Sequence, residues 1–327
     1  MLHRFALFVA ACTVLLLLAG SLVTSTGSGL SVPDWPTTYG QNMFTFPPSK
    51  WVGGIFYEHG HRLIASTVGF LTIILAAWLW RAEPRRWMKW LGVSALGAVI
   101  LQGALGGLTV LFFLPAAISS AHAGLAEIFF CITVSIALFT SPAWLIADRP
   151  LDDRRLRRLA TATTLVIYLQ ILVGAVMRHT DAGLAIPDFP WMFGHVVPDH
   201  WDARIAVHFA HRVGALIVAS FIFSLAANIW RRHADRPALR RPAAFIAALV
   251  LVQITLGALT VLTARDVWIN SVHLVCGALV LATSIVITLR SWRTRIVAAT
   301  EGHAAAVALP GPAGRPDRAA TPSGARA

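Results

Sequence analysis

Eight long apolar runs limit the folds open to this chain more than any other feature of the sequence. Each run approaches the roughly 20 residues that a helix needs to cross the hydrocarbon core of a bilayer. The runs are continuous rather than alternating, which favours helices over a β-barrel. With 57% hydrophobic and 13% charged residues, the chain also falls well below the roughly 25% charged residues of soluble domains. We therefore predict an all-α integral membrane protein whose transmembrane helices lie near residues 5–23, 62–80, 91–113, 121–147, 157–177, 207–230, 242–263 and 271–290.

The net charge of +12 could suggest nucleic acid as a partner, but the basic residues are not spread evenly. They gather after the second, fourth, sixth and eighth runs, and the intervening loops hold few of them. An excess of Lys and Arg marks the cytoplasmic loops of membrane proteins. We therefore expect membrane lipid and no nucleic acid around this chain, both termini in the cytoplasm, and residues 24–60, 114–120, 178–206 and 264–270 outside.

Two halves of the sequence repeat one another. Residues 26–36 and 180–190 share the pattern Thr-x-x-Gly-Leu-x-x-Pro-Asp-aromatic-Pro, and the third and seventh runs both carry Gln followed by Leu-Gly and Leu-Thr-Val. An even number of helices per half keeps the copies parallel. We predict two pseudo-symmetric four-helix bundles, at 1–147 and 157–297, joined by a cytoplasmic connector at 148–156 and followed by a disordered cytoplasmic tail at 298–327.

The repeated loop combines prolines with an Asp-aromatic pair, which favours a rigid extended turn over a helix. Such a loop could simply lie back over the outer face, or it could act as a lid over a cofactor edge, and the two interpretations are compatible. We expect Gln102 and Gln253 of the repeated helices to bond across helices rather than to touch a ligand.

Four histidines stand at matched places, at the outer ends of the even-numbered runs: His61 and His122 in the first half, His211 and His273 in the second. Neutral imidazole is a common axial ligand of haem iron. No Cys-x-x-Cys-His motif occurs, so a haem would be held without covalent attachment. Polar capping of helix ends is the alternative. A zinc site is disfavoured because neither half has an obvious third ligand other than Glu58.

Glu58 precedes His61 by three residues and Arg62 by four, so all three share one helix face. The second half repeats the His-Arg pair at His211 and Arg212 but has His208 in place of the carboxylate. Glu58 could form an ion pair with Arg62, or act as a catalytic carboxylate beside a cofactor. The two arginines could bind haem propionates or anchor the helices at the membrane interface.

The remaining polar residues of the apolar runs have simpler interpretations. Glu127 lies five residues after His122, about 140° around a helix, and we expect it to bond to a neighbouring helix. We expect the three cysteines to be small buried hydrophobic groups. His59, His179, His195, His200 and His208 lie in or near the outer loops, where solvation or local hydrogen bonds are expected.

Taken together, these motifs resemble the haem A synthase family over about residues 5–292. Glu-x-x-His-Arg stands at 58–62, His-Arg at 211–212, the partner histidines at His122 and His273, and Pro-Asp-Trp-Pro at 33–36. Many bacterial members of that family carry a cysteine pair around this last motif. Val32 and Thr38 occupy those places here, so no thiol relay could operate in this loop.

The resemblance implies an oxidoreductase that converts the C8 methyl group of haem O to a formyl group by successive hydroxylations, for cytochrome c oxidase biogenesis. His211 and His273 would hold haem b as cofactor, and His61 and His122 would receive haem O, with Glu58 near the reacting methyl group. A bacterial plasma membrane is the expected location. Haem O synthase is the expected partner, with oxidase assembly factors and a homo-oligomer as further candidates. A quinol-linked di-haem electron carrier and a haem transporter remain alternative functions.

Overall fold

The computed structural model describes residues 1–146 and 151–308, which contain helices and loops but no β-strand. Eight helices are long and apolar enough to cross a membrane, which confirms the predicted all-α membrane class. The first four are α1 (Leu2–Ser25), α2 (Gly54–Ala82), α3 (Arg86–Leu111) and α4 (Ala116–Phe139). The other four are α6 (Arg154–His179), α7 (Ala203–Arg232), α8 (Pro237–Leu262) and α9 (Val267–Ala308). A 3-10 turn, η1 (Pro48–Lys50), and a single helical turn, α5 (Pro142–Leu145), complete the set.

Several helix ends differ from the apolar runs that predicted them. α7 begins at Ala203 because Asp202 caps it, accepting a hydrogen bond from the Ile205 N–H at 2.7 Å. The fourth helix was expected to reach residue 147 but ends at Phe139, and Pro142 starts the separate turn α5. The proline cannot continue the α4 hydrogen-bond ladder because it has no backbone N–H.

The predicted connector and tail differ from the structure in a similar way. α6 starts at Arg154, inside the connector predicted at 148–156, and residues 147–150 lie outside the described range. α9 continues to Ala308, although disorder was predicted from 298, and only its part up to Ala298 has membrane-spanning character. Residues 309–327 of the predicted tail are not described.

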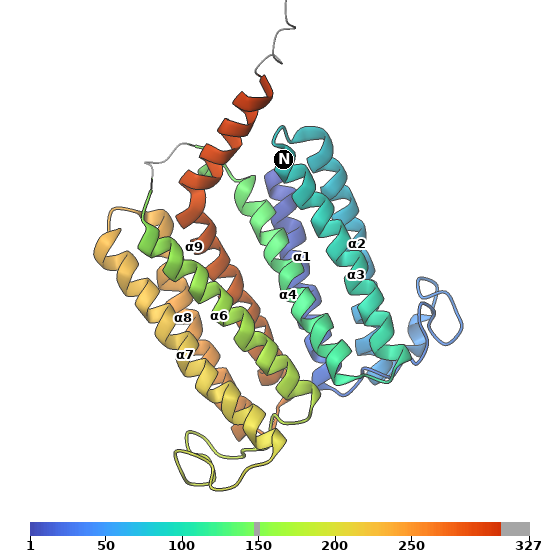
Figure 1. The fold of residues 1–327 in the computed structure, drawn as a ribbon. Helices are drawn as coiled ribbons and strands as arrows, with labels where there is room; N and C mark the ends of the chain where they lie inside the picture. Colours follow the sequence, from blue (N-terminus) through green and yellow to red (C-terminus); the bar gives the residue numbers. More distant parts are fainter. Residues whose placement is uncertain (147–150, 309–327) are drawn as a thin grey trace, which may run out of the picture.

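Each half closes into a ring of four helices (Figure 1). In the first half, α1 packs on α2, α2 on α3, α3 on α4, and α4 back on α1. The second half repeats this order with α6, α7, α8 and α9. α2 therefore lies diagonally across from α4, and α7 from α9, so side chains from the diagonal helices can meet in the middle of each ring.

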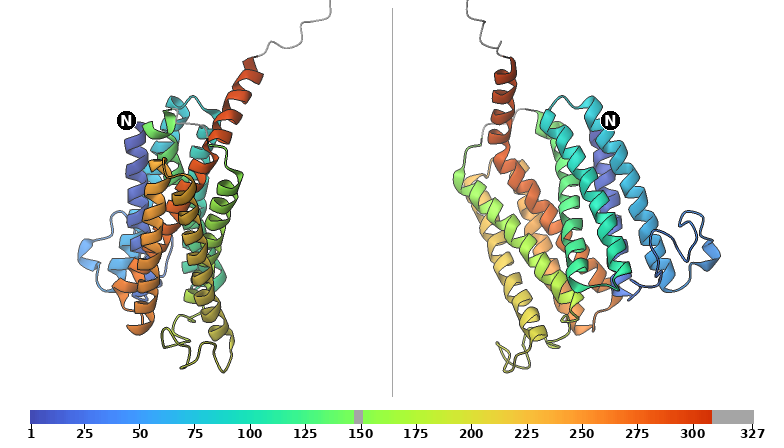
Figure 2. Two further views of the ribbon diagram at one scale, coloured as in Figure 1. Left: turned by 90° about the vertical axis from the view of Figure 1, so that its left-hand side faces the viewer. Right: turned by 45° about the vertical axis from the view of Figure 1, so that its right-hand side comes forward.

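The contacts between the halves follow the same repeat. α1 packs on α9, its counterpart α6 packs on α4, and α4 and α9 pack on each other. A pseudo-two-fold relation between the halves predicts this set of contacts, with α4 and α9 nearest the axis. Apolar side chains fill the junction, where Leu17, Phe130, Ala278 and Ala282 form a cluster separate from the core of either half. The right-hand view of Figure 2 shows the two bundles side by side.

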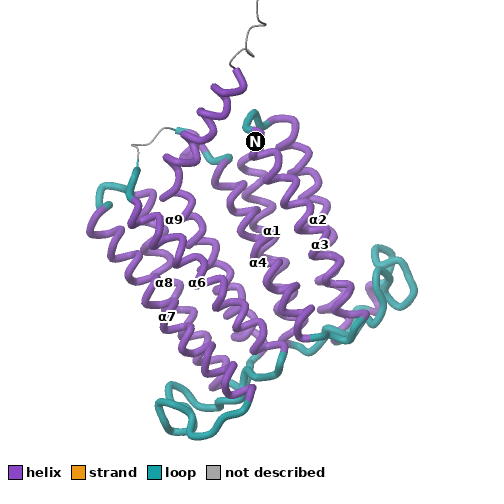
Figure 3. Tube along the Cα trace, viewed as in Figure 1, coloured by secondary structure: helices purple, strands orange, loops and turns teal. Residues whose placement is uncertain are grey.

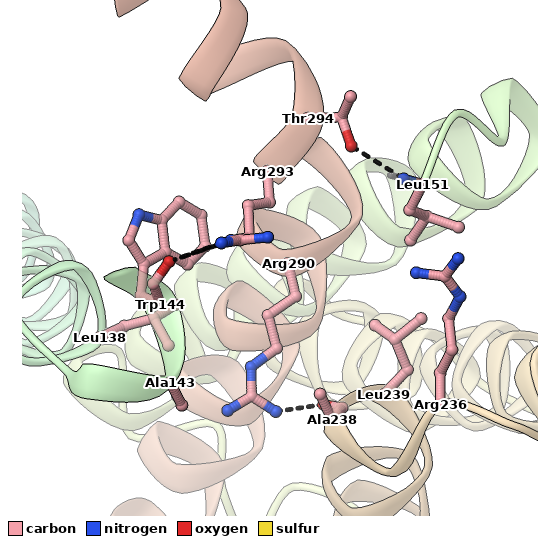
Figure 4. Close-up of a pocket in the computed structure, with 10 residues that line it drawn as sticks. All are labelled: Leu138, Ala143, Trp144, Leu151, Arg236, Ala238, Leu239, Arg290, Arg293 and Thr294. Carbon is pink, nitrogen blue, oxygen red and sulfur yellow. Dashed lines mark hydrogen bonds between the residues drawn. The ribbon is translucent and has the colours of Figure 1, made fainter. Parts of the chain in front are cut away.

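The two ends of the bundle differ. One end, which we call the loop end, carries the long segments 26–53 and 180–202 (Figure 3). The other, the connector end, carries the start of α1, the links between α2 and α3 and between α7 and α8, and the outgoing part of α9. At the connector end a pocket is lined by Trp144, Arg236, Arg290 and Arg293, and Arg293 donates to the Trp144 carbonyl at 2.8 Å (Figure 4).

The three cysteines are free thiols in apolar surroundings, which agrees with their prediction as small hydrophobic groups. Cys12 packs against the core of the first half, Cys131 against that of the second, and Cys276 is buried.

Candidate functional site

The four predicted histidines fall into two pairs at the loop end, one pair per half. His61 of α2 and His122 of α4 come close enough to interact electrostatically, as do His211 of α7 and His273 of α9. Because these helices are diagonal in their rings, each pair approaches from opposite sides of the bundle interior. All four side chains are partly buried.

Each imidazole lies against a glycine of a neighbouring helix. A Cβ atom on Gly20 would stand 3.0 Å from His61 Cε1, and one on Gly106 would stand 3.2 Å from His122 Cε1. The second half repeats these contacts at 2.9 Å for Gly174 and His211, and at 3.1 Å for Gly257 and His273. The glycine leaves room for the ring edge against the opposing helix backbone, so the same packing positions all four rings.

Glutamines contact three of these four histidines. Gln102 Nε2 donates to the His122 carbonyl at 2.9 Å and lies 3.4 Å from the ring Nε2, while Gln253 Nε2 lies 3.4 Å from the Nε2 of His273. The prediction that these glutamines bond across helices is confirmed. Gln170 was not predicted, yet its Nε2 donates to the His211 carbonyl at 2.7 Å and lies 3.0 Å from Nδ1. The spacing Gln-x-x-x-Gly at 102–106, 170–174 and 253–257 is the signal that could have found it.

The donor set fits a haem better than a lone metal ion. The Nδ1 atoms of His61, His122 and His273 are buried without a hydrogen-bond partner. Within residues 1–146 and 151–308, no three His, Cys, Asp or Glu side chains gather as ligands of one ion would. Zinc requires four ligands, whereas haem iron takes one imidazole on each face. Two imidazoles per half therefore match the axial positions of one haem per half.

Glu58 and Arg62 hold the first loop onto α2. Glu58, only 3% exposed, accepts the Val32 N–H at 2.8 Å through Oε2 and Arg62 Nη2 at 2.7 Å through Oε1. Arg62 also donates to the carbonyls of Val32 at 2.8 Å, Asp34 at 2.7 Å and Thr37 at 3.1 Å. The predicted ion pair is confirmed. The assignment of Arg62 to a haem propionate stays a prediction, since its contacts here are to the loop.

His208 and Arg212 hold the second loop in the same way. The Ile186 N–H points at His208 Nδ1 at 3.2 Å, and Arg212 Nε points at Nε2, also at 3.2 Å. The remaining Arg212 donors reach the carbonyls of Ile186 at 3.0 Å, Asp188 at 2.7 Å and Trp191 at 2.9 Å. The propionate assignment of Arg212 likewise stays a prediction. His208 is buried rather than solvated, at 2% exposure.

An aspartate organises the tip of each loop. Asp34 accepts the N–H groups of Tyr39 and Gly40, both at 2.8 Å, and the hydroxyl of Thr37. Asp188 accepts those of Phe193 at 2.8 Å and Gly194 at 2.9 Å. Burial alone would raise the pKa of each carboxyl, but the hydrogen bonds outweigh it, so the pKa of both lies below its usual value. The prolines and these aspartates together account for the predicted rigid turn.

The first loop also covers the His122 side of the bundle. The Trp35 indole lies on Gly107 of α3, where a Cβ would come within 2.6 Å of the ring. Gly107 follows Gly106, the residue that faces His122. The loop therefore lies over the helix that supports one candidate ligand, which is compatible with both predicted roles, a structural cover and a lid.

At Val32 and Thr38, the positions of the cysteine pair in many bacterial relatives, the first loop makes buried polar contacts with α2. Both residues are fully buried. Thr38 Oγ1 lies 3.1 Å from Nδ1 of His59, whose ring is wedged between Phe46 and Trp51. Of the two predicted alternatives for His59, solvation or a local hydrogen bond, the structure shows the local hydrogen bond. His59 is fully buried rather than solvated.

Glu127 corrects one expectation. It was predicted to bond to a neighbouring helix, but its Oε2 is buried without a partner, and no hydrogen bond to its side chain occurs among the described residues. One turn earlier on α4, Gly124 touches Leu172 and Tyr168 of α6, which places this face of α4 at the junction of the halves. The spacing from His122 predicted that Glu127 would face away from that histidine. It could not predict whether α6 would provide a hydrogen-bond partner for the carboxyl group.

Comparison with known proteins agrees with this geometry. The family model COX15-CtaA, described as a cytochrome oxidase assembly protein, matches residues 3–285. A protein of Geobacillus kaustophilus named heme A synthase is 28% identical over 94% of this chain and 98% of its own length. Proteins of the same name from Symbiobacterium thermophilum (79% of this chain, 85% of its own) and Shouchella clausii (68% and 74%) are both 31% identical.

The family match spans both helix rings, both loops and all four histidines, so it covers the whole of the site described above. The chain therefore belongs to the COX15-CtaA family of cytochrome oxidase assembly proteins.

Proposed function

We propose that this chain acts as a haem A synthase, an oxidoreductase that converts the C8 methyl group of haem O to a formyl group by successive hydroxylations. Its relatives over nearly the full chain are named heme A synthase. The observation that carries the proposal is the asymmetry of two otherwise matched sites. Both halves offer an imidazole pair, but only the first places a carboxylate, Glu58, on the helix face that also bears His61.

In this proposal the two halves divide the work. His61 and His122 bind the substrate haem O, and His211 and His273 bind haem b as the cofactor. Haem b, when bound, supplies an iron atom that can exchange electrons. The glycine contacts support haem ligation in both halves, because they hold all four rings at the bundle interior.

Glu58 is the proposed catalytic residue. Its Oε2 accepts the Val32 N–H and its Oε1 accepts a hydrogen bond from Arg62, which fixes the orientation of the carboxylate. A buried carboxylate in this state can accept a proton or stabilise positive charge that develops on the substrate. Arg62 keeps it oriented, and the loop above it limits the access of water.

The same evidence supports the proposed location. Eight membrane-length helices and bacterial relatives support a multi-pass protein of a bacterial membrane. The clusters of arginine at the connector end favour the orientation with both termini in the cytoplasm and the histidines near the outer face. Haem O synthase, oxidase assembly factors and a second copy of the chain are the proposed partners, within the lipid bilayer.

The test is to produce the chain in membranes that make haem O but no haem A, extract the non-covalent haems and separate them by chromatography. Haem A or its hydroxylated precursor is the expected product. Glu58→Ala should retain haem and lose product. Folded, haem-loaded protein that yields only haem B and unchanged haem O, even with membranes that support a known haem A synthase, contradicts the proposal.

A quinol-linked di-haem electron carrier is the second candidate, and one observation favours it. The glycine contact recurs at all four histidines, and an electron carrier would use both halves alike. In that case Glu58→Ala would leave electron transfer between the haems unchanged and no haem product would form with the native chain.

A further inference from the structure

The four histidine sites are alike in their glycine contact but not in their glutamine contact. Gln102, Gln170 and Gln253 each reach the histidine that faces the glycine four residues further along the same helix. The fourth helix of this kind, α1, has Leu16 four residues before Gly20. No hydrogen bond to the His61 ring occurs in the part of the chain that the structure describes, and its Nδ1 is buried.

A second difference goes with the first. The Gln170 amide lies directly over Gly214, three residues after His211, where even a Cβ atom would overlap its Oε1. The residue three after His61 is Ile64. Leu16 instead packs against the apolar core of the first half. The α1–α2 pair therefore lacks the glutamine, and Ile64 stands where Gly214 makes room for Gln170 in the α6–α7 pair, so the variant that copies the second half changes both residues.

The missing contact has a predictable effect on a ligand. Gln102 and Gln170 are each bonded to the backbone carbonyl of a histidine and packed at its ring edge, and a contact of this kind restricts rotation of the imidazole. Loss of such an outer partner typically lowers metal affinity by about 10- to 100-fold. Among the described residues His61 has the glycine contact and no glutamine contact, whereas His122 across the bundle has both.

We propose that His61 is the exchangeable axial ligand of the first half, and that Leu16 and Ile64 make it so by excluding a glutamine. The substrate haem then stays attached through His122 while His61 releases and rebinds, and His211 and His273 retain the cofactor haem. This inference rests on the proposed haem ligation in both halves. It explains why one of two matched sites can exchange its haem while the other keeps it.

Carbon monoxide provides the test, because it binds a six-coordinate ferrous haem only after an axial histidine has left. The full chain is purified in detergent, loaded with haem B in both halves and reduced, and the rates of CO binding are measured by stopped flow. We expect one fast and one slow phase. His61→Gly identifies the first-half phase, since it removes the histidine that limits that rate.

The swap variants then test the cause. Leu16→Gln/Ile64→Gly should slow the fast phase by about 10-fold or more, and Gln170→Leu should speed the slow phase by a similar factor. Leu16→Met, which keeps an apolar side chain of similar volume, is the matched control and should leave both rates unchanged.

Two outcomes overturn the inference while leaving haem ligation intact: equal CO-binding rates in the two halves of the native chain, or a Leu16→Gln/Ile64→Gly variant with native haem content and an unchanged fast phase. The native-chain rates and Gln170→Leu decide the matter if the double variant does not fold. Failure of the proposed haem ligation looks different, because the native chain would then show no low-spin haem spectrum that His61→Ala or His211→Ala alters, and this outcome overturns both. Failure of the synthase activity alone would appear as absence of haem A while the two CO-binding phases remain.

Discussion

The loops of the two halves are held at matched positions of α2 and α7, but the side chain that receives the contacts differs between them. In the first half Glu58 accepts the Val32 N–H and an arginine, and in the second His208 faces the equivalent Ile186 N–H and arginine. A carboxylate can accept both bonds at once, but a neutral imidazole has only one acceptor nitrogen. The comparison shows that holding the loop needs an acceptor at this position but does not need a negative charge.

This refines the sequence-based argument that Glu58 has no counterpart. His208 is its counterpart in position and in contacts, and what the second half lacks is the charge. The charge is therefore the feature that a first-half reaction would use. Variants that replace the carboxylate of one half by the imidazole of the other can separate the structural role of Glu58 from its proposed catalytic role.

The largest expected effect comes from Glu58→His, which copies the second-half arrangement into the first. The loop should stay in place because an acceptor remains for Arg62 or Val32, but haem A formation should fall by about 100- to 10,000-fold, the usual contribution of a proton-transferring group. Product is measured by chromatography of extracted haems and retention of haem by absorbance. Full activity in Glu58→His would leave Glu58 with the structural duty alone. His208→Gln, the matched control, should keep most of the product.

Removing each arginine should destabilise the halves unequally. Arg62→Ala leaves the buried Glu58 charge unpaired, which costs about 3–5 kcal/mol. Arg212→Ala leaves only neutral groups without a donor, at about 1–3 kcal/mol. Thermal unfolding in detergent should therefore show a larger fall in Tm for Arg62→Ala. Equal falls would mean that the ion pair contributes no more than the neutral contact.

The glycine contacts can be tested within one helix. Gly106→Ala places a methyl group 3.2 Å from His122 Cε1, whereas a Cβ on Gly103 meets nothing within 4 Å. We expect Gly106→Ala to shift the low-spin haem spectrum of the first half and to destabilise it by about 1–3 kcal/mol, since overpacked sites respond in this range. Gly103→Ala is the control and should leave the spectrum as it is. If Gly106→Ala changed neither the haem spectrum nor the stability, the His122 ring would be free to move away from the added methyl group.

The smallest effect concerns the loop tips, where the two halves should respond alike. The pKa of Asp34 and of Asp188 lies below its usual value, so their stabilising contribution is complete above pH about 4. It is lost as the pH falls through the lowered pKa of the folded state. Hydrogen exchange at the Gly40 and Gly194 amides should thus be insensitive to these carboxyls near neutral pH and lose protection only in stronger acid. Protection lost already at pH 6 would contradict this assignment.

The sequence by itself determined the membrane class, the internal repeat and the four histidines. Apolar runs are a property of consecutive residues, and a bilayer requires their backbone groups to bond within the helix, so length and hydrophobicity were enough. The matched motifs placed His61, His122, His211 and His273 at one end of the bundle without any knowledge of packing.

Only the tertiary structure decided what surrounds those residues. The bond from Val32 to Glu58 joins positions 26 residues apart, and the contact of Gln170 with His211 joins positions 41 apart. Contacts of this kind depend on which helices adjoin and how they are rotated, and local sequence does not specify either. The same reason explains why Glu127 was expected to find a partner and has none for its Oε2. It also explains why the sequence does not mark Leu16, whose significance depends on the glutamines that the other three helices place at the histidines.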